Sequence, residues 1–474
     1  MQNNVIVISI FMLLCFKNIT AQPLPIDEHS IVPLDSVYEA PKSPLDIINT
    51  QALDHFFYKL YELEHLKKGK VRIVQVGDSH IQADFLTNAS KAIFQKQFGN
   101  GGLGFVFPHK LAKTNGPSTI TYKTNAMFLS NRNVRPLTND PIGISGYSLA
   151  TTNKNSAIEV TIKNQQDYVN SIKIITPNNN KFFDLGFSTT NLIPFQNYTS
   201  KNKTHKVVSG ETLFSIARKY NVTVDYIKKL NGLKSNTIAA GKLLKIGAHN
   251  PVENEINKSN FEIIDLQNEG TSYAYNSKVL LNKFYLVPNH VQNEFYINGL
   301  VLENDTPGIT YSGIGVNGAK LSDYNKYDLF FEQMQALNPD LLIVSFGTNE
   351  SFDKLSAKEF IKNLETFITK IRQYTPVVSI LVTTPPPSTL YKKYNNTYIT
   401  DYTKQLIDYA IQYQTIAVFN LYEAFGGTNG VKINKDKGYL AKDEVHYTKN
   451  GYEQQGMLLA ESILKAYQNY ISNK

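Results

Sequence analysis

Two parts of the chain alternate apolar strands with amphipathic helices. An amphipathic helix near residues 53–63 precedes a buried strand at 71–76, which ends in Gly77-Asp78-Ser79-His80. The helix predicted after this turn buries Ile81, Phe85, Leu86, Ala89 and Ile93. Further strands are predicted at 340–346, 377–383 and 416–421, and helices at about 326–337, 356–371, 399–413 and 451–468. Apolar strands that alternate with helices indicate a parallel sheet covered on both faces, so the predicted fold class is α/β.

The middle of the chain has a different pattern. From about residue 116 to 300 the apolar stretches are short and are separated by clusters of Asn, Pro and Gly. Short strands with frequent turn signals predict a β-sandwich. Because this region separates a first strand–helix unit at 45–115 from the rest of the α/β pattern at 301–474, we interpret it as an insertion.

A third pattern lies inside the insertion. Residues 204–247 predict a strand, two short helices and a closing strand, a compact βααβ unit. Its segments Val208–Leu213 and Asn231-Gly232-Leu233 closely resemble a LysM module, which implies binding of glycans that contain N-acetylglucosamine. A spacer that has lost its ligand is the alternative. The resemblance suggests as glycan-binding residues Gly210, Glu211, Thr212, Asn231 and Gly232.

The N-terminus is typical of an exported protein. The apolar run Val5–Phe16 is shorter than the roughly 20 residues of a membrane-spanning helix, and Ile19-Thr20-Ala21 offers a cleavage site. We therefore expect a signal peptide at 1–22, although the first four residues include no Lys or Arg. A proline-rich tether at 23–44 follows. No later run is long enough to span a bilayer, so we expect a periplasmic or extracellular protein without an integral membrane segment.

Composition and spacing exclude several classes of function. The 48 basic and 40 acidic residues are scattered, which gives no nucleic-acid signature and a weak preference for acidic polymers. One cysteine, Cys15, excludes a disulfide scaffold, and His109, His205 and His290 lack metal-ligand spacing. Residues 99–104 match the dinucleotide fingerprint by letter, but a helix precedes them where a strand is needed. We expect neither a metal nor another cofactor.

Four polar residues are placed for acyl chemistry. Ser79 and Asn349 each follow a predicted parallel strand, at the sheet edge where open α/β folds bind ligands. Asp443 and His446 stand three residues apart before the last helix, so the carboxylate can orient the imidazole toward a serine. Each residue alone has a structural explanation, such as a helix N-cap for Ser79. Their combination predicts a serine nucleophile with a histidine base.

These residues fall in four segments that resemble the sequence blocks of SGNH (GDSL-type) hydrolases, in the family's order. The blocks are Gly77-Asp78-Ser79, Val316-Asn317-Gly318, Gly347-Thr348-Asn349 and Asp443-x-x-His446. The resemblance covers about 45–115 and 301–474. It implies that Ser79 is the nucleophile, His446 the base and Asp443 its orienting partner. It also implies an oxyanion hole formed by the N–H groups of Ser79 and Gly318 and the side-chain amide of Asn349.

Two positions depart from the commonest family pattern. His80 stands where that pattern has Leu, and Glu350 where it has Asp. The Gly-Asp-Ser-His form is similar to peptidoglycan O-acetylesterases, which also carry a β-sandwich after the first block. His80 is therefore either a mark of this subgroup or a polar residue at a helix start.

We predict an exported serine esterase that removes O-acetyl groups from peptidoglycan or a related cell-wall glycan. One alternative is an O-acetyltransferase that uses the same triad, and another is a non-catalytic glycan-binding protein. Lys and Tyr side chains along 391–404 form a basic aromatic strip. We interpret this strip as a solvated helix face rather than a glycan contact. The oligomeric state is left open.

Overall fold

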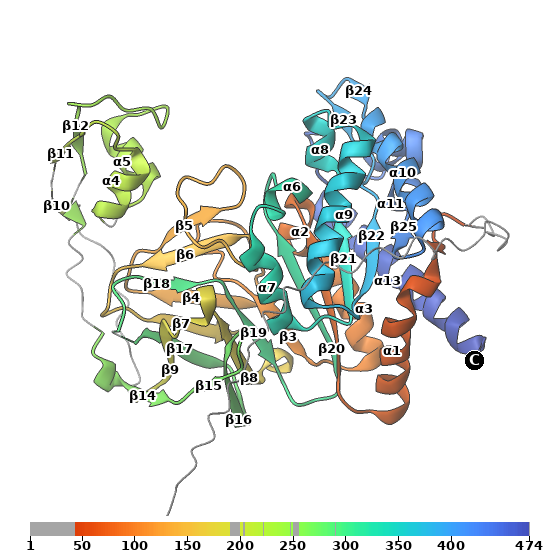
Figure 1. The fold of residues 1–474 in the computed structure, drawn as a ribbon, viewed down its shortest axis with the longest axis horizontal. Coiled ribbons are helices and arrows are strands. Elements are labelled where there is room, and N and C mark those ends of the chain that lie inside the picture. The colour runs from red at the N-terminus through yellow and green to blue at the C-terminus, as the bar shows by residue number, and fades with distance from the viewer. Residues whose placement is uncertain are drawn as a thin grey trace, which may run out of the picture. The chain divides into compact units, whose positions relative to one another are not determined.

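The computed structural model (Figure 1) describes most of the chain beyond the predicted leader and tether. The described residues are 43–189, 200–201, 204–220, 222–246, 248–249, 256–289 and 291–473. The predicted signal peptide at 1–22 and nearly all of the tether at 23–44 lie outside them. Within the described ranges, no helix combines the length and the apolar character that a membrane crossing requires.

A six-stranded sheet with the order β1-β25-β22-β21-β2-β20 forms the centre of the α/β part. Its strands are β1 (Ile47–Ile48), β2 (Lys70–Gly77), β20 (Gly308–Gly315), β21 (Leu341–Ser345), β22 (Ser379–Thr383) and β25 (Ala417–Phe419). Five of them run parallel, and β1 pairs antiparallel with β25 at one edge. The α/β fold class with a parallel sheet is confirmed.

Helices cover both faces of this sheet because successive strand residues point to opposite sides. Val71 and Ile73 of β2 pack in one core, with α1 (Asp54–Leu66), α3 (Phe85–Phe98) and α13 (Lys449–Ser472). Val74 and Val76 pack in a second core, with α7 (Asp328–Leu337), α9 (Ala357–Tyr374) and α10 (Thr397–Tyr413). Shorter helices of this part are α6 (Leu321–Tyr324), α8 (Thr348–Phe352), α11 (Leu421–Ala424) and α12 (Gly430–Asp436).

The helix predicted after Ser79 is divided in two. Helix α2 spans Ser79–Gln82, and α3 begins at Phe85 after Asp84, whose φ of 62° lies in the left-handed region. A left-handed residue ends one helix and changes the direction of the next. Phe85 is therefore exposed, contrary to the prediction that it belongs to the buried face.

The insertion contains two five-stranded antiparallel sheets, ordered β14-β9-β17-β7-β4 and β15-β16-β8-β19-β3, and a three-stranded sheet ordered β18-β6-β5. Their strands are β3 (Gly102–Val106), β4 (Ile120–Thr124), β5 (Leu129–Arg132), β6 (Tyr147–Thr151), β7 (Ile158–Ile162), β8 (Val169–Ile175), β9 (Phe183–Ser188), β14 (Phe261–Ile264), β15 (Gln267–Asn268), β16 (Tyr273–Leu281), β17 (Lys283–Pro288), β18 (Phe295–Ile297) and β19 (Gly299–Glu303). Strand β3 lies before the predicted start at residue 116, and β19 extends past 300. Sandwich packing of the sheets stays a prediction.

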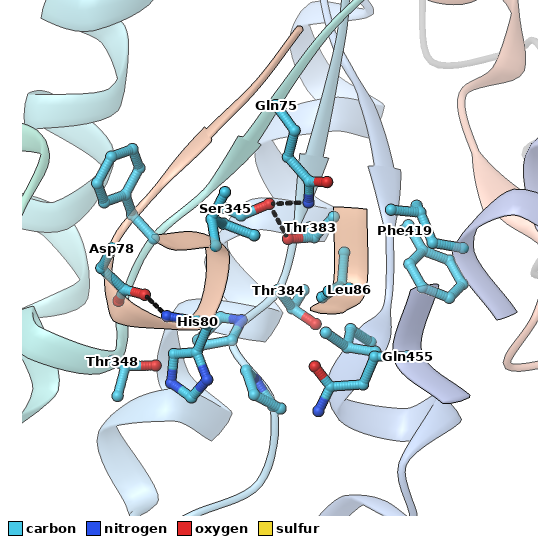
Figure 2. Close-up of a pocket in the computed structure, with 16 residues that line it drawn as sticks. Gln75, Asp78, His80, Leu86, Ser345, Thr348, Thr383, Thr384, Phe419 and Gln455 are labelled. Atoms are coloured by element: carbon cyan, nitrogen blue, oxygen red, sulfur yellow. Dashed lines mark hydrogen bonds between the residues drawn. The ribbon is translucent and has the colours of Figure 1, made fainter. Parts of the chain in front are cut away.

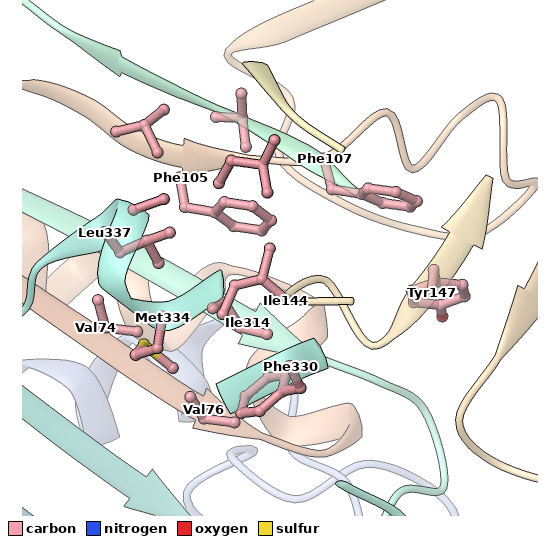
Figure 3. Close-up of a cluster of buried hydrophobic side chains, with 14 of the residues drawn as sticks. Val74, Val76, Phe105, Phe107, Ile144, Tyr147, Ile314, Phe330, Met334 and Leu337 are labelled. Atoms are coloured by element: carbon pink, nitrogen blue, oxygen red, sulfur yellow. The ribbon is translucent and has the colours of Figure 1, made fainter. Parts of the chain in front are cut away.

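One buried core continues from the parallel sheet into the insertion. Figure 3 shows side chains of β2, β20 and α7 in the same cluster as side chains of the insertion. They include Val74, Val76, Ile314, Phe330, Met334 and Leu337 from the α/β part and Phe105, Phe107, Ile144 and Tyr147 from the insertion and its first strand. Burying a large apolar side chain contributes about 1.5–3 kcal/mol, so this shared core fixes the insertion beside the sheet.

The βααβ unit has a separate core. It consists of β11 (Thr204–Lys206), α4 (Leu213–Lys219), α5 (Val224–Asn231) and β12 (Leu243–Lys245), with β11 antiparallel to β12. The short strands β10 (Ser200–Lys201) and β13 (Ala248–His249) pair just outside it. The unit buries Leu213, Ile216, Ile227, Leu244 and Ile246. The predicted order of elements is confirmed.

Candidate active site

Ser79 lies at the carboxyl edge of the sheet, where β2 passes into α2. Gly77 ends β2 so close to β21 that a Cβ atom there would lie 2.6 Å from the carbonyl oxygen of Ser345. Asp78 caps α2, because its Oδ1 accepts a hydrogen bond of 2.9 Å from the backbone N–H of His80. The tight passage from strand to helix leaves Ser79 half-buried, with its hydroxyl group at the edge.

The hydroxyl group of Ser79 meets an imidazole from the other end of the chain. The Oγ atom of Ser79 lies 2.9 Å from Nε2 of His446, and Nδ1 of His446 lies 2.7 Å from Oδ2 of Asp443. Glu444 has a φ of 60°, which turns the chain so that His446 faces Asp443. Three residues that we predicted to meet thus form one row of hydrogen-bonding contacts.

Asp443 is held as a carboxylate. Partial burial alone would raise its pKa, but hydrogen bonds from the His446 side chain and from the backbone N–H groups of Val445 and His446 lower the pKa to about 2. The side chains of Asp443 and His446 are 49% and 43% exposed. An ionised carboxylate therefore stands against the ring, and water can reach the imidazole.

The three predicted oxyanion donors lie on adjoining turns. Gly318 follows β20 with a φ of 82°, and Asn349 lies in α8 after β21. The Nδ2 atom of Asn349 donates to Oδ2 of Asp78 at 3.1 Å and to the carbonyl oxygen of Ala319 at 3.0 Å. Asn349 therefore joins the neighbour of Ser79 to the neighbour of Gly318. Within the described part of the chain, the backbone N–H groups of Ser79 and Gly318 donate no hydrogen bond.

Two buried carboxyl groups lie next to these turns. Burial raises the pKa values of Asp78 and Glu350 to about 7. Oε1 of Glu350 accepts a hydrogen bond of 2.9 Å from the N–H of Leu321, and Oε2 accepts one of 3.0 Å from the N–H of Gly347. One side chain thus fastens the turn after β20 to the turn after β21. The sequence marked Glu350 only as a departure from the family pattern.

Replacing Glu350 with alanine is expected to destabilise the α/β part by about 3 kcal/mol, because it leaves two buried N–H groups without acceptors. The chain contains no Trp. The measurement is therefore urea unfolding followed by circular dichroism and by loss of esterase activity.

The matched control for this variant is Glu359→Ala. Glu359 occupies the equivalent N3 position in α9 and accepts from the N–H of Ser356 at 3.2 Å, but it is exposed. We expect a much smaller fall in unfolding free energy for this control. Equal falls for the two variants would show that Glu350 does not fasten the two turns.

The buried ring of His80 lies beside the imidazole of His446. Its ring centroid lies 5.4 Å from that of His446, and its Nδ1 atom lies 3.0 Å from Oη of Tyr452. Burial lowers the pKa of His80 to about 3, with a smaller contribution from the charge of His446. His80 is therefore neutral near pH 7 and places no fixed positive charge beside His446. Nothing in the sequence pointed to Tyr452.

Gln82 is a second residue that sequence reasoning missed. Its Oε1 atom accepts a hydrogen bond of 2.6 Å from the N–H of Asn317. Its Nε2 atom donates to Oγ1 of Thr114 at 2.6 Å and to the carbonyl oxygen of Asn115 at 3.1 Å. Gln82 thereby fixes the residue before Gly318 against the segment that leads into the insertion.

A small cavity lies behind the site, between α2 and the ends of β21 and β22. Figure 2 shows Asp78 and His80 at its wall, and Ser345 hydrogen-bonded to Gln75 and Thr383, each at 2.9 Å. Neither Ser79 nor His446 lines it. The cavity is therefore separate from the contact between Ser79 and His446.

Several suggested LysM contact residues serve the fold of the module itself. Oε2 of Glu211 accepts from the N–H of Val208 at 2.8 Å, and Thr212 caps α4. The side chain of Asn231 bonds the backbone of Lys245 in both directions, at 2.6 and 2.7 Å. Gly210 and Gly232 have positive φ angles of 87° and 64° at exposed turns. Glycan contact by these five residues stays a prediction.

The described residues form no metal site and no dinucleotide turn. They include no group of three or more His, Cys, Asp or Glu residues that is placed to hold a metal ion. Residues 99–104 follow α3 and run into β3, which is the reverse of the strand-to-helix order that the fingerprint requires.

Two segments match known domains. Residues 205–247 match the LysM domain, and residues 288–454 match the GDSL-like lipase/acylhydrolase family. The second match includes Gly318, Asn349, Asp443 and His446 and begins after the segment that contains Ser79.

Curated relatives are similar over short stretches. One stretch of 43 residues is 49% identical to the probable peptidoglycan endopeptidase LytE of Bacillus subtilis (strain 168), covering 9% of this chain and 13% of that protein. Another of 106 residues is 30% identical to N-acetylmuramoyl-L-alanine amidase sle1 of Staphylococcus haemolyticus (strain JCSC1435), covering 22% of this chain and 30% of that protein. The chain thus spans less than a third of either relative.

A solved structure of a peptidoglycan O-acetylesterase has a similar fold. It aligns with a TM-score of 0.55 and 20% sequence identity, over 88% of this chain and 96% of that one. The likeness extends over most of both chains, so it covers more than the parallel sheet. The protein therefore combines a region that matches the GDSL-like lipase/acylhydrolase family with a region that matches the LysM domain.

Proposed function

We propose that this protein is an exported carbohydrate esterase that removes O-acetyl groups from peptidoglycan or a related cell-wall glycan. The observation that carries the proposal is the row Ser79–His446–Asp443, in which the serine and the histidine are 367 positions apart. A helix-cap serine needs no imidazole partner, and a structural histidine needs no serine at the sheet edge. The LysM domain supports a cell-wall glycan as the substrate.

In the proposed reaction, Oγ of Ser79 attacks the acetyl carbonyl carbon while Nε2 of His446 accepts the serine proton. Asp443 stabilises the resulting imidazolium. The N–H groups of Ser79 and Gly318 and the amide of Asn349 bind the negative oxygen of the tetrahedral intermediate. When the C–O bond to the sugar breaks, His446 returns its proton to the leaving sugar hydroxyl group.

The second half of the reaction releases acetate. A water molecule attacks the acetyl-serine, His446 accepts a proton from it, and the ester bond to Ser79 breaks. Ser79 recovers its proton and acetate leaves. The partly exposed ring of His446 favours water as the acceptor, whereas an acetyltransferase needs a sugar hydroxyl group in the same place.

The LysM domain would act by tethering. It buries a hydrophobic core of its own, so it can hold a glycan strand without taking part in the chemistry. Tethering raises the effective concentration of acetylated sugars at Ser79 without forming a new contact there. The proposed location is the cell wall, in the periplasm or outside the cell.

The proposal is tested with O-acetylated peptidoglycan and the purified chain. We expect free acetate to appear in the amount by which bound acetyl groups decrease. A parallel reaction includes a chitooligosaccharide acceptor, and its products are examined by mass spectrometry. Acetyl groups on the acceptor would identify a transferase. If bound acetyl groups do not decrease in either reaction, the assignment to peptidoglycan is wrong.

A further inference from the structure

A short hairpin lies beside the catalytic loop, within the strip that we interpreted as a helix face. It consists of β23 (Thr389–Leu390) and β24 (Tyr394–Asn395), and helix α10 begins only at Thr397. Figure 1 shows the hairpin at the same end of the parallel sheet as α8. The helix interpretation is therefore wrong for residues 391–395. The reason is the turn at Tyr391 and Lys392, whose positive φ angles are incompatible with a right-handed helix.

The turn presents two aromatic rings to solvent. The side chains of Tyr391 and Tyr394 are 70% and 58% exposed. The N–H of Lys393 bonds the carbonyl oxygen of Leu390 at 3.1 Å, and the two residues between them, Tyr391 and Lys392, have φ angles of 58° and 56°. Hairpin turns with two positive φ angles usually contain Asn-Gly, because bulky residues are strained there. Tyr391 and Lys392 are strained at an exposed tip, and their side chains do not pack in a core that would explain the strain.

The hairpin is fixed to the loop that contains the triad. The N–H of Thr389 bonds the carbonyl oxygen of Glu444 at 3.0 Å, and Oη of Tyr447 bonds the carbonyl oxygen of Pro387 at 2.7 Å. Glu444 lies between Asp443 and His446, and Tyr447 directly follows His446. Tyr391 is only two residues from Thr389. Its backbone therefore lies within about 7 Å of a residue that is bonded to the catalytic loop.

The chemistry of the tip fits an acidic polysaccharide. A tyrosine ring has an apolar face that can pack on the C–H face of a sugar ring, and a hydroxyl group that remains in water. Nζ of Lys393 lies 5.1 Å from the ring centroid of Tyr394, and Lys392 is exposed beside it. Neither lysine forms an ion pair within the residues that the structure describes. The charge of Lys392 contributes to the lowered pKa of Glu444, but that carboxylate is paired with Lys435 at 2.8 Å. The local excess of positive charge favours a ligand that carries carboxylates.

We propose that residues 389–395 form a sugar-binding subsite, in which Tyr391 and Tyr394 stack on pyranose rings of the strand whose acetyl group enters the catalytic site. The two lysines interact with carboxylates along that strand. This inference rests on the proposed function, because it names how the same substrate is held. The subsite is distinct from the LysM domain and acts next to the reacting ester.

The test compares the variant Tyr391→Ala/Tyr394→Ala with Tyr391→Phe/Tyr394→Phe and with Tyr413→Ala. Tyr413 ends α10 and is 52% exposed, so it serves as a matched surface tyrosine. With soluble O-acetylated peptidoglycan fragments, we expect the double alanine variant to raise KM about tenfold with little change in kcat. The phenylalanine and Tyr413 variants should stay within about twofold of the unmodified chain, because each leaves both rings of the subsite in place.

Hydrolysis of p-nitrophenyl acetate separates this proposal from the assigned function. That small ester has no neighbouring sugars, so all four proteins should hydrolyse it equally. An unchanged KM for glycan fragments in the double alanine variant would overturn the subsite and leave the esterase proposal intact. An equal loss in the phenylalanine variant would overturn stacking as its basis. If the unmodified chain releases no acetate from the fragments, the proposed function fails, and the subsite fails with it.

Discussion

Replacement of Ser79 with alanine is expected to lower kcat for p-nitrophenyl acetate by at least about 10⁴-fold. Without Oγ, no acetyl-enzyme can form, and His446 loses the group that lies 2.9 Å from its Nε2 atom. The residual reaction would come from the oxyanion donors and from bound water. Spectrophotometric detection of p-nitrophenol measures the loss, and the variant should still bind insoluble peptidoglycan through its LysM domain.

The matched control for this prediction is Ser345→Ala. Ser345 ends β21 at the same edge and is similarly half-buried, but it bonds Gln75 and Thr383 rather than His446. The control should keep its activity within about threefold, because the two hydrogen bonds that it removes, each of about 1 kcal/mol, lie away from the reacting atoms. If Ser79→Ala retains a tenth of the activity, or if Ser345→Ala loses as much, Ser79 is not the nucleophile.

The second large effect is expected at Asn349. Removing one oxyanion donor typically lowers kcat by about 10²–10³-fold, so we expect a loss of that size for Asn349→Ala with KM nearly unchanged. Steady-state kinetics on p-nitrophenyl acetate give both constants. In the free protein, the amide hydrogens of Asn349 point to Asp78 and Ala319. Binding of an oxyanion therefore requires one of these hydrogen bonds to be shared or released.

The same two bonds give Asn349 a structural role, which the experiment must separate from catalysis. Asn317→Ala is the control, because Asn317 lies next to Gly318. Among the residues that the structure describes, its Nδ2 bonds Oδ1 of Asn115 alone, at 3.1 Å. Circular dichroism before the assay establishes that both variants are folded. A folded Asn349→Ala variant that loses less than about threefold in kcat would remove Asn349 from the oxyanion hole.

The regular elements of the α/β part were largely predictable. Strand β21 and helix α9 have apolar patterns that only one kind of element satisfies, and the structure places the ends of both within about three residues of the prediction. The Asp443–His446 loop lies between α12 and α13, so the family's block order rather than the sheet indicated its place. The approach of Ser79 and Asn349 follows from parallel topology, because parallel strands present their carboxyl ends at one edge. Pattern and topology are thus sufficient to place these side chains near one another.

The remaining features depend on backbone conformation or on distant partners. Asp84 and Tyr391 both have positive φ angles, but neither is a glycine, so the sequence did not predict these two turns. The contact between Tyr452 and His80 joins residues 372 positions apart, and the bond from Gln82 to Asn317 joins residues 235 apart. The sequence identified Glu350 as unusual, but it did not predict that this side chain accepts hydrogen bonds from the N–H groups of Leu321 and Gly347. Such pairs arise only after the whole sheet has assembled.

The order of the strands has a consequence for how the chain folds as it is made. Strand β2 lies inside the sheet between β20 and β21, and Lys70 pairs with Gly308 and Ile73 with Leu341. Both neighbours follow the entire insertion in sequence. Newly synthesised β2 therefore has two unpaired backbone edges and two apolar faces until more than 200 further residues exist. Pairings of such long range form slowly and leave intermediates prone to aggregation. We therefore expect the newly made chain to aggregate unless that strand is shielded until β20 and β21 exist.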